Sequence, residues 1–340
     1  MSPSSKTANV LFVGIDLGTS RSVISASNGQ RHSVESYVGW PKDFVAKKML
    51  KRPVLFGAEA LEHRLALNIH RPLEHGVLKE GTEQDAAAVE ALIGHLISLA
   101  QSEPGDNICA AVGVPAEALK VNKIAIRSAI KDHARTMMVV SEPFAVAYGV
   151  GALDNAMVID IGAGTVDFCI MHGTVPGEDD QRSLVTAGDH VDVQLLKLLS
   201  EKYPKADFTL NMVRKFKEEH GFVGEPAGKV EVKVPVEGRF IPHDITNELR
   251  KACESIMPPI VETAMELIAG FDPEYQDKVR NNIILAGGGS LIKGISEYLA
   301  EAIRQYEPCK ITCVEDPLHA GAAGALELAR DMPEEYLEQL

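Results

Sequence analysis

Two short segments of this sequence place an aspartate two residues before a glycine and follow it with hydroxyl side chains: "IDLGTS" and "IDIGAGTVD". Glycines let backbone N–H groups approach an anion, and the hydroxyls add further donors. The aspartates Asp16 and Asp160 would repel a phosphate, so a cation is implied between them. Mg²⁺ fits this role, because it retains water and is commonly held by one or two carboxylates plus phosphates. The residues predicted for this chemistry are Asp16, Gly18, Thr19 and Ser20 in the first segment and Asp160, Gly162, Gly164 and Thr165 in the second.

Each segment joins two apolar stretches, which predicts a β-hairpin over residues 10–23 and another over residues 156–171. Alternating β-branched residues on both sides of a glycine-containing turn are typical of a hairpin. A single hairpin of this kind is weak evidence for phosphate binding, and an aspartate that merely caps its own turn is the alternative. The repetition favours a duplicated domain in which each half presents one turn, so that the two turns form a clamp.

A third glycine cluster lies in "NNIILAGGGSLIKGISEYLAEAIRQY". The pattern predicts a strand, then residues 287–290, then an amphipathic helix. Such a glycine run suits a ligand near a helix N-terminus, although glycine also makes ordinary strand-to-helix turns. The segment has neither the lysine of a P-loop nor the spacing of a dinucleotide fingerprint.

The composition excludes several classes of protein. The 340 residues suffice for two domains, and no apolar run approaches the roughly 18 residues that span a bilayer. A net charge of −14 disfavours a nucleic-acid partner, and the short basic run "KKMLKR" is better explained as a solvated face. The first nine residues, "MSPSSKTAN", lack the apolar core of a signal peptide and the apolar face of a membrane-surface helix. We therefore expect a cytoplasmic protein with no direct membrane binding.

The three glycine segments, in this order, resemble the two phosphate loops and the adenosine segment of the actin, Hsp70 and sugar kinase superfamily. "VVSEPFAVAYGVG" and "HAGAAGALELA" are similar to its two connecting helices. Within the superfamily, "VGWPKDF", "GTVPGEDDQ" and "PEEYLEQL" resemble the MreB-related bacterial actins of magnetosome filaments. The resemblance runs from about residue 10 to the C-terminus and implies an α/β fold of the actin-like ATPase type. In this fold, two duplicated RNase H-like domains each carry a smaller inserted subdomain, with a nucleotide cleft between the domains.

The resemblance also implies where the four subdomains lie. They are IA at residues 10–35, 81–150 and 319–340, IB at 36–80, IIA at 151–191 and 255–318, and IIB at 192–254.

By resemblance, Glu142 positions the water that attacks the γ-phosphate, and Asp167 lies near the same water. Lys217 and Glu218 contact the ribose and adenine. Judged without the family, Glu142 could be an ordinary first-turn helix acid, and Lys217 and Glu218 could belong to the solvated face of an amphipathic helix. Arg21 stands where a smaller side chain is usual, and it either reaches a phosphate or is solvated. The remaining implied nucleotide contacts are Asp16, Gly18, Thr19, Ser20, Asp160, Gly162, Ala163, Gly164, Thr165, Gly287, Gly288, Gly289 and Ser290, with Asp16 and Asp160 holding Mg²⁺ through water.

The implied function is that of a cytoskeletal ATPase that binds ATP and Mg²⁺, hydrolyses ATP slowly to ADP and phosphate, and polymerises into dynamic filaments. Its implied partners are copies of itself and magnetosome-associated adaptor proteins, and its implied role is to align magnetosomes. The alternatives are an MreB-like cell-shape or plasmid-segregation actin, and a non-polymerising sugar kinase or chaperone-type ATPase. A sugar kinase would need a catalytic aspartate in a substrate pocket, and the sequence shows no such signature.

Overall fold

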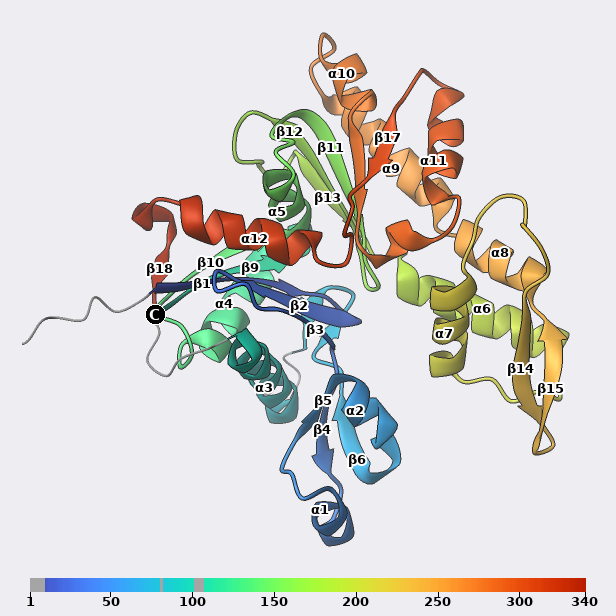
Figure 1. Cartoon of the computed structure of the whole chain (residues 1–340). Coiled ribbons are helices and arrows are strands. Elements are labelled where there is room, and N and C mark those ends of the chain that lie inside the picture. Colours follow the sequence, from blue (N-terminus) through green and yellow to red (C-terminus); the bar gives the residue numbers. More distant parts are fainter. Residues whose placement is uncertain (1–9, 80–81, 101–106) are drawn as a thin grey trace, which may run out of the picture. The chain divides into compact units, whose positions relative to one another are not determined.

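The computed structural model describes residues 10–79, 82–100 and 107–340. The chain forms two compact units (Figure 1). The first combines Met1–Ala152 with Leu318–Leu340, and the second is Leu153–Pro317. Within the described ranges, no helix is both long enough and apolar enough to cross a membrane.

A six-stranded mixed sheet forms the centre of the first unit, in the order β18-β10-β9-β1-β2-β3. Strands β1, β9 and β10 run parallel, whereas β2, β3 and β18 pair antiparallel with their neighbours. The two central strands are rich in apolar residues, as is usual for strands covered on both faces. The strand bounds are β1 Val10–Leu17, β2 Arg21–Ala26, β3 Arg31–Glu35, β9 Asn107–Val114, β10 Thr136–Ser141 and β18 Glu338–Gln339.

Helices cover both faces of this sheet, with α5 and α12 on one face and α3 and α4 on the other (Figure 1). Helix α12 lies directly on β1 at Gly14, where a Cβ would be 2.2 Å from both the Ala322 carbonyl oxygen and the Leu326 nitrogen. The backbones of α5 and α12 also touch, because a Cβ at Gly324 would lie 1.7 Å from the Ala145 carbonyl oxygen. The bounds are α3 Glu83–Ala100, η2 Ala116–Ala118, α4 Leu119–Ile130, α5 Glu142–Gly149, α12 Ala320–Asp331 and η4 Glu334–Tyr336.

Between β3 and α3, the chain forms a three-stranded sheet in the order β5-β4-β6 and a short hairpin of β7 and β8. Helix α1 begins after Asp43, whose carboxylate accepts hydrogen bonds of 2.9 Å from the Val45 and Ala46 amides. The Phe56 ring stacks on the His95 ring of α3, with the ring centroids 4.1 Å apart. The bounds are β4 Val38–Pro41, α1 Phe44–Leu50, β5 Leu55–Phe56, α2 Gly57–Glu62, η1 Arg64–Ala66, β6 Leu67–His70, β7 Leu73–Glu74 and β8 Val77–Leu78.

The second unit contains a five-stranded sheet in the order β13-β12-β11-β16-β17. Strands β11, β16 and β17 run parallel, and β12 and β13 pair antiparallel. The sheet strands are β11 Asp154–Ile161, β12 Val166–His172, β13 Gln181–Leu184, β16 Ile283–Ala286 and β17 Ile311–Cys313. The other elements are α6 Gly188–Lys202, α7 Leu210–His220, β14 Glu231–Val236, β15 Arg239–Asp244, α8 Thr246–Glu254, α9 Met257–Gly270, α10 Gln276–Arg280, η3 Gly288–Leu291 and α11 Ile295–Arg304.

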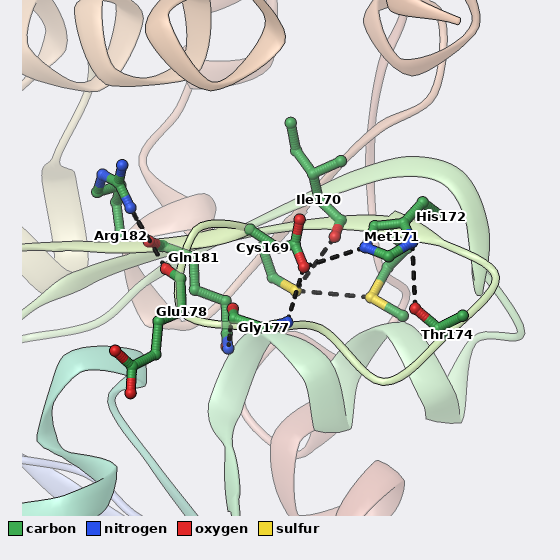
Figure 2. Close-up of polar contacts among 10 residues, drawn as sticks. Cys169, Ile170, Met171, His172, Thr174, Gly177, Glu178, Gln181 and Arg182 are labelled. Atoms are coloured by element: carbon green, nitrogen blue, oxygen red, sulfur yellow. Dashed lines mark hydrogen bonds and ion pairs between the residues drawn. The ribbon is translucent and has the colours of Figure 1, made fainter. Parts of the chain in front are cut away.

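The loop between β12 and β13 is closed by a set of polar contacts (Figure 2). The Asp180 carboxylate accepts a 2.7 Å hydrogen bond from the Gly177 amide and lies 3.0 Å from Nε2 of His172. The other ring nitrogen of His172 lies 3.1 Å from the Thr174 hydroxyl. This loop carries the "GTVPGEDDQ" segment and returns the chain so that Ser183 of β13 pairs with Asp167 of β12.

Both predicted hairpins are confirmed. Strand β1 pairs antiparallel with β2, and β11 pairs antiparallel with β12. In each unit, the first strand of the hairpin also pairs in parallel with a strand on its other side, which is β9 in one case and β16 in the other. The two units therefore repeat the same three-strand arrangement, as expected for a duplication.

The predicted order of strand, glycine cluster and amphipathic helix is confirmed by β16, residues 287–290 and α11. The structure adds that Gly288 opens the 3₁₀ turn η3 and that α11 begins at Ile295. Gly294 separates the two elements with a φ of +81°, a left-handed conformation that glycine adopts readily. Two of the three clustered glycines, Gly288 and Gly289, thus lie within a tight turn that precedes the helix.

Candidate functional site

The first candidate turn, residues 18–20, connects β1 to β2. It is tight, because a Cβ at Gly18 would lie 2.3 Å from the Arg21 carbonyl oxygen. Thr19 is buried, and Asp16 is half-buried near the end of β1. The structure therefore brings an aspartate, a glycine and two hydroxyl residues together at one end of the sheet.

The segment that follows β3 braces this turn. The Ser36 hydroxyl donates a 2.6 Å hydrogen bond to the Gly18 carbonyl, and the Ser36 amide donates to the Ser20 carbonyl at 2.9 Å. The Gly76 amide, between β7 and β8, donates to the Thr19 hydroxyl at 3.1 Å. Because this hydroxyl is the acceptor, its own proton can be donated to a ligand. Sequence reasoning missed these bracing residues.

Glu142 and Asp16 lie at the same edge of the first sheet. Asp16 of β1 pairs with Gly113 of β9, and Gly113 pairs with Val140 of β10, two residues before Glu142 begins α5. A Cβ at Gly113 would lie 3.5 Å from Cγ of Glu142 and 3.9 Å from Cα of Asp16. Since parallel strands end at one edge, the predicted catalytic glutamate and the predicted magnesium ligand become neighbours.

Asp16 also lies against the start of α12. A Cβ at Gly321 would be 2.7 Å from Oδ2 of Asp16. Any residue other than glycine would therefore force the Asp16 carboxylate to move. The small residues of the segment "HAGAAG" are consistent with this close approach, although sequence reasoning assigned no role to Gly321.

The second candidate turn, residues 162–165, connects β11 to β12. Asp160 and Asp167 form a cross-strand pair in this hairpin, and both are buried together with Thr165. The Gly162 amide closes the turn by donating to the Thr165 carbonyl at 2.9 Å. The Ser183 hydroxyl donates a short hydrogen bond to the Asp167 carboxylate, which fixes its orientation.

The start of helix α6 braces the second turn. The amides of Gly188 and Asp189 donate to the carbonyls of Gly162 and Ala163, at 3.1 Å and 2.7 Å. A side chain at residue 188 would crowd this contact, because a Cβ would lie 3.2 Å from Cα of Ala163. The first two amides of the helix are thus used to hold the turn, another contact that sequence reasoning missed.

The third glycine cluster lies beside the second turn. Ala286, at the end of β16, pairs with Asp160. Gly287 has a φ of +75°, and a Cβ there would lie 2.2 Å from Oδ1 of Asp160. A Cβ at Gly289 would lie 2.2 Å from the Ile161 side chain, and the Ser290 hydroxyl donates to the Gly287 carbonyl at 2.7 Å. Residues 287–290 therefore pack directly against the end of β11.

The remaining predicted site residues divide into two groups. Lys217 is not solvated: its ammonium donates a 2.7 Å hydrogen bond to the Gly188 carbonyl, next to the second turn. In contrast, Glu218 is exposed on α7. Arg21 lies 3.6 Å from the Glu35 carboxylate of the neighbouring strand, so its observed partner is an acid of β3.

The chain matches the family described as MreB/Mbl protein over residues 10–336. It is 41% identical over 332 residues to the actin-like protein MamK of Paramagnetospirillum magneticum, covering 98% of this chain and 96% of that protein. It is 40% identical to the actin-like protein MamK of Magnetospirillum gryphiswaldense, covering 98% and 92%. Two solved structures are also similar, each at 41% identity over 96% of this chain and 100% of the solved chain. One is a MamK double helical filament, with a TM-score of 0.93, and the other is a non-polymerising MamK mutant bound to AMPPNP, with a TM-score of 0.73.

The repeated hairpin units and these similarities together define an actin-like fold. The chain belongs to the MreB/Mbl family of actin-like proteins.

Proposed function

We propose that this chain binds and hydrolyses ATP and assembles with copies of itself into filaments. The observation that carries this proposal is the repetition of one construction in the two units. In each unit, an aspartate of β1 or β11 precedes a tight glycine turn with a buried threonine, braced by a second segment of the chain. We propose that each turn binds phosphate groups of a nucleotide. The similar MamK structures support this view, since one is described as bound to AMPPNP and another as a filament.

Asp16 and Asp160 are the residues that would hold a hydrated Mg²⁺. Their carboxylates are the hard oxygen donors that this ion prefers, and Gly321 and Gly287 leave each carboxylate free of a neighbouring Cβ. When bound, the ion would neutralise charge on the phosphate oxygens.

The donors for the phosphates are the hydroxyls of Thr19, Ser20 and Thr165 together with the turn backbone. Glycines at the turns let a ligand approach that backbone closely. We assign the ribose and adenine to Lys217, Glu218 and residues 287–290, of which the last group packs beside Asp160. We also retain subdomain limits at 36–80 and 192–254 as part of this proposal.

Glu142 is the residue we assign to orienting the attacking water. It starts α5 at the sheet edge that carries Asp16, and Gly113 leaves space between these two residues. Asp167 would lie near the same water, with its carboxylate held by Ser183. Phosphoryl transfer to water depends mainly on positioning and charge stabilisation, which these fixed groups supply.

Substitution of Glu142 tests the hydrolytic part of the proposal. We expect Glu142→Ala to bind nucleotide and assemble while phosphate release falls by about 10²–10⁴-fold, the usual contribution of a positioned base. Glu225→Ala, at an exposed glutamate, is the matched control and should hydrolyse normally. Hydrolysis by Glu142→Ala at the native rate would remove Glu142 from the site.

Asp160→Ala tests the predicted use of magnesium. Titration calorimetry should show weaker binding of ATP in the presence of Mg²⁺, because one of the two carboxylates that hold the hydrated ion is lost. Unchanged affinity and turnover would show that Asp160 does not serve the nucleotide.

An exposed apolar surface is available for self-assembly in the first unit. The α1 tip consists of Phe44, Val45 and Met49 of α1 together with Leu65, and Phe44 and Leu65 are 80% and 85% exposed. The Leu65 carbonyl accepts a 2.9 Å hydrogen bond from Lys42, two residues before Phe44, which brings these segments together. Large apolar side chains gathered in this way mark an interaction surface.

Sedimentation with and without Mg-ATP tests assembly. Pelleting that requires Mg-ATP would support a filament. Persistent solubility at high concentration, with phosphate transferred to a small hydroxyl compound, would instead indicate a kinase and contradict the proposal.

We further propose that the filament lies in the cytoplasm, aligns magnetosomes and is tethered by magnetosome-associated adaptor proteins. The resemblance to MamK, at higher identity than to the cell shape-determining protein Mbl of Bacillus cereus, supports this role. Deletion of the chain in its host should scatter the organelles. An unchanged row of organelles, together with altered cell shape, would favour the alternative role.

A further inference from the structure

Two pairs of opposite charges face each other between helices α6 and α7. Asp189 and Asp192 are three residues apart on α6, and Arg214 and Lys217 have the same spacing on α7, so each pair occupies one face of its helix. Arg214 bridges both acids, with Nε 3.0 Å from Asp192 and Nη2 3.2 Å from Asp189. Lys217 Nζ lies 2.7 Å from the other oxygen of Asp192.

These charges are largely removed from solvent. The Asp192 side chain is fully buried, and those of Arg214 and Lys217 are 10% and 12% exposed. A buried ion pair contributes little net stability, because desolvation offsets the attraction, and apolar side chains of similar volume often stabilise a fold more. The two positive and two negative charges cancel within the cluster. Stability alone therefore does not account for this arrangement.

The charge cluster is connected to the second candidate turn through Gly188. The Gly188 carbonyl accepts a 2.7 Å hydrogen bond from Lys217, and the Gly188 amide donates to Gly162 in the turn. The Asp189 amide donates to Ala163, the next residue of the turn. The Lys217 ammonium thus lies one peptide unit from the turn that we assign to phosphate.

We propose that Asp192 is a positioning residue that holds Lys217 at the nucleotide and so acts on ligand affinity without touching the ligand. This inference rests on the proposed function. Lysine has a flexible four-carbon stem, so its ammonium needs a fixed partner to stay in one place. The Gly188 carbonyl uses one of its three N–H donors, the Asp192 carboxylate attracts its charge from 2.7 Å, and a further N–H is available to a polar or anionic group of the nucleotide. Arg214 keeps the Asp192 carboxylate in place by fixing its other oxygen.

A double-mutant cycle distinguishes this role from a general structural one. We expect Asp192→Asn and Lys217→Met each to weaken AMPPNP binding by about tenfold or more, as for loss of a charge-assisted hydrogen bond. In the Lys217→Met background, Asp192→Asn should cause little further loss, because Asp192 acts through Lys217. Glu201→Gln and Lys215→Met, at exposed positions of the same two helices, are the matched controls and should bind normally.

Two results would overturn the inference: native affinity in Asp192→Asn, or an equal loss caused by Asp192→Asn in both backgrounds. If Asp192→Asn does not fold, Arg214→Lys replaces it in the same cycle, since lysine keeps the charge but lacks the fork that reaches both acids. Failure of the unmodified protein to bind AMPPNP would instead refute the proposed function, so the two failures are distinguishable.

Discussion

Replacing Gly324 by alanine should destabilise the first unit, because α5 and α12 contact each other through backbone atoms. A Cβ at Gly324 would lie 1.7 Å from the Ala145 carbonyl oxygen, whereas ordinary contact begins near 3.4 Å. Gly149 faces the same crossing, and a Cβ there would lie 2.8 Å from Cα of Gly324. A backbone carbonyl cannot rotate away as a flexible side chain can, so the helices must separate.

The magnitude follows from two opposing effects. Overpacking a close-packed core costs about 1–3 kcal/mol and occasionally more, and the backbone clash places Gly324→Ala at the upper end. Alanine recovers about 1 kcal/mol over glycine through helix propensity. The net loss is therefore about 2 kcal/mol, which lowers the Tm of a unit of this size by about 4–8 °C.

Scanning calorimetry of the purified protein measures this change. Gly270→Ala, at the last residue of α9, is the control, because a Cβ there meets nothing within 4 Å, and its Tm should stay close to native. Gly14→Ala approaches α12 from the strand side and should cost at least as much as Gly324→Ala, because a strand residue gains nothing from helix propensity. A Tm for Gly324→Ala equal to that of Gly270→Ala would refute the described packing of α5 against α12.

Three further outcomes can be measured. The double substitution Phe44→Ser with Leu65→Ser should raise the protein concentration needed for sedimentation with Mg-ATP, because it removes apolar side chains of the α1 tip. The control Ile124→Ser, at a side chain 77% exposed outside that tip, should not change this concentration. An equal effect of both variants would exclude the tip as a contact. A thiol reagent at pH 8 should modify Cys313 alone in the folded protein and all five cysteines after denaturation, because the other four thiols are buried. Mass spectrometry counts the adducts, and rapid modification of a second thiol in the folded protein would contradict this burial. Burial, and next the charge of a nearby arginine, lower the pKa of His95 below 6.5 in the folded protein. The unfolded state therefore binds more protons at His95, and the stability associated with the neutral imidazole is lost as the pH falls below about 6.5. Denaturant midpoints at pH 7.5 and 5.5 should therefore differ less in His95→Phe than in the native protein, and an unchanged difference would exclude His95 as a source.

The two turns could be predicted from the sequence because their signal is local. Asp16 and Asp160 each end an apolar strand pattern, and the glycines and hydroxyls that follow specify a tight hairpin. Helix α7 was also predictable, because its apolar residues recur with helical spacing. In these cases, the residues that determine the structure lie within a few positions of each other.

The bracing residues could not be predicted, because their contacts join segments far apart in the chain. Ser36 holds the first turn, and Gly188 holds the second. Neither residue stands in a distinctive pattern, and each acquires its role only when another element packs beside it. The same reason explains Lys217, whose partner Asp192 lies on a different helix.

Glycine positions show a further limit of sequence reasoning. Gly113 and Gly321 keep space beside Asp16, but glycine in a sequence can equally mark a turn, a flexible point or a close approach. Only the position of the neighbouring backbone separates these alternatives. The 3₁₀ turn before α11 could not be predicted for the same reason, since it depends on residues 287–290 packing against β11.

The place of α12 in the chain has a consequence for biosynthesis. This helix covers β1, yet its residues are translated after the whole of the second unit. A ribosome-bound chain can therefore complete the second unit while one face of the earliest strand still lacks its covering helix. Until residues 320–331 leave the ribosome, the first unit cannot reach its final packing, so a translation product that stops short of them leaves Gly14 and its strand uncovered.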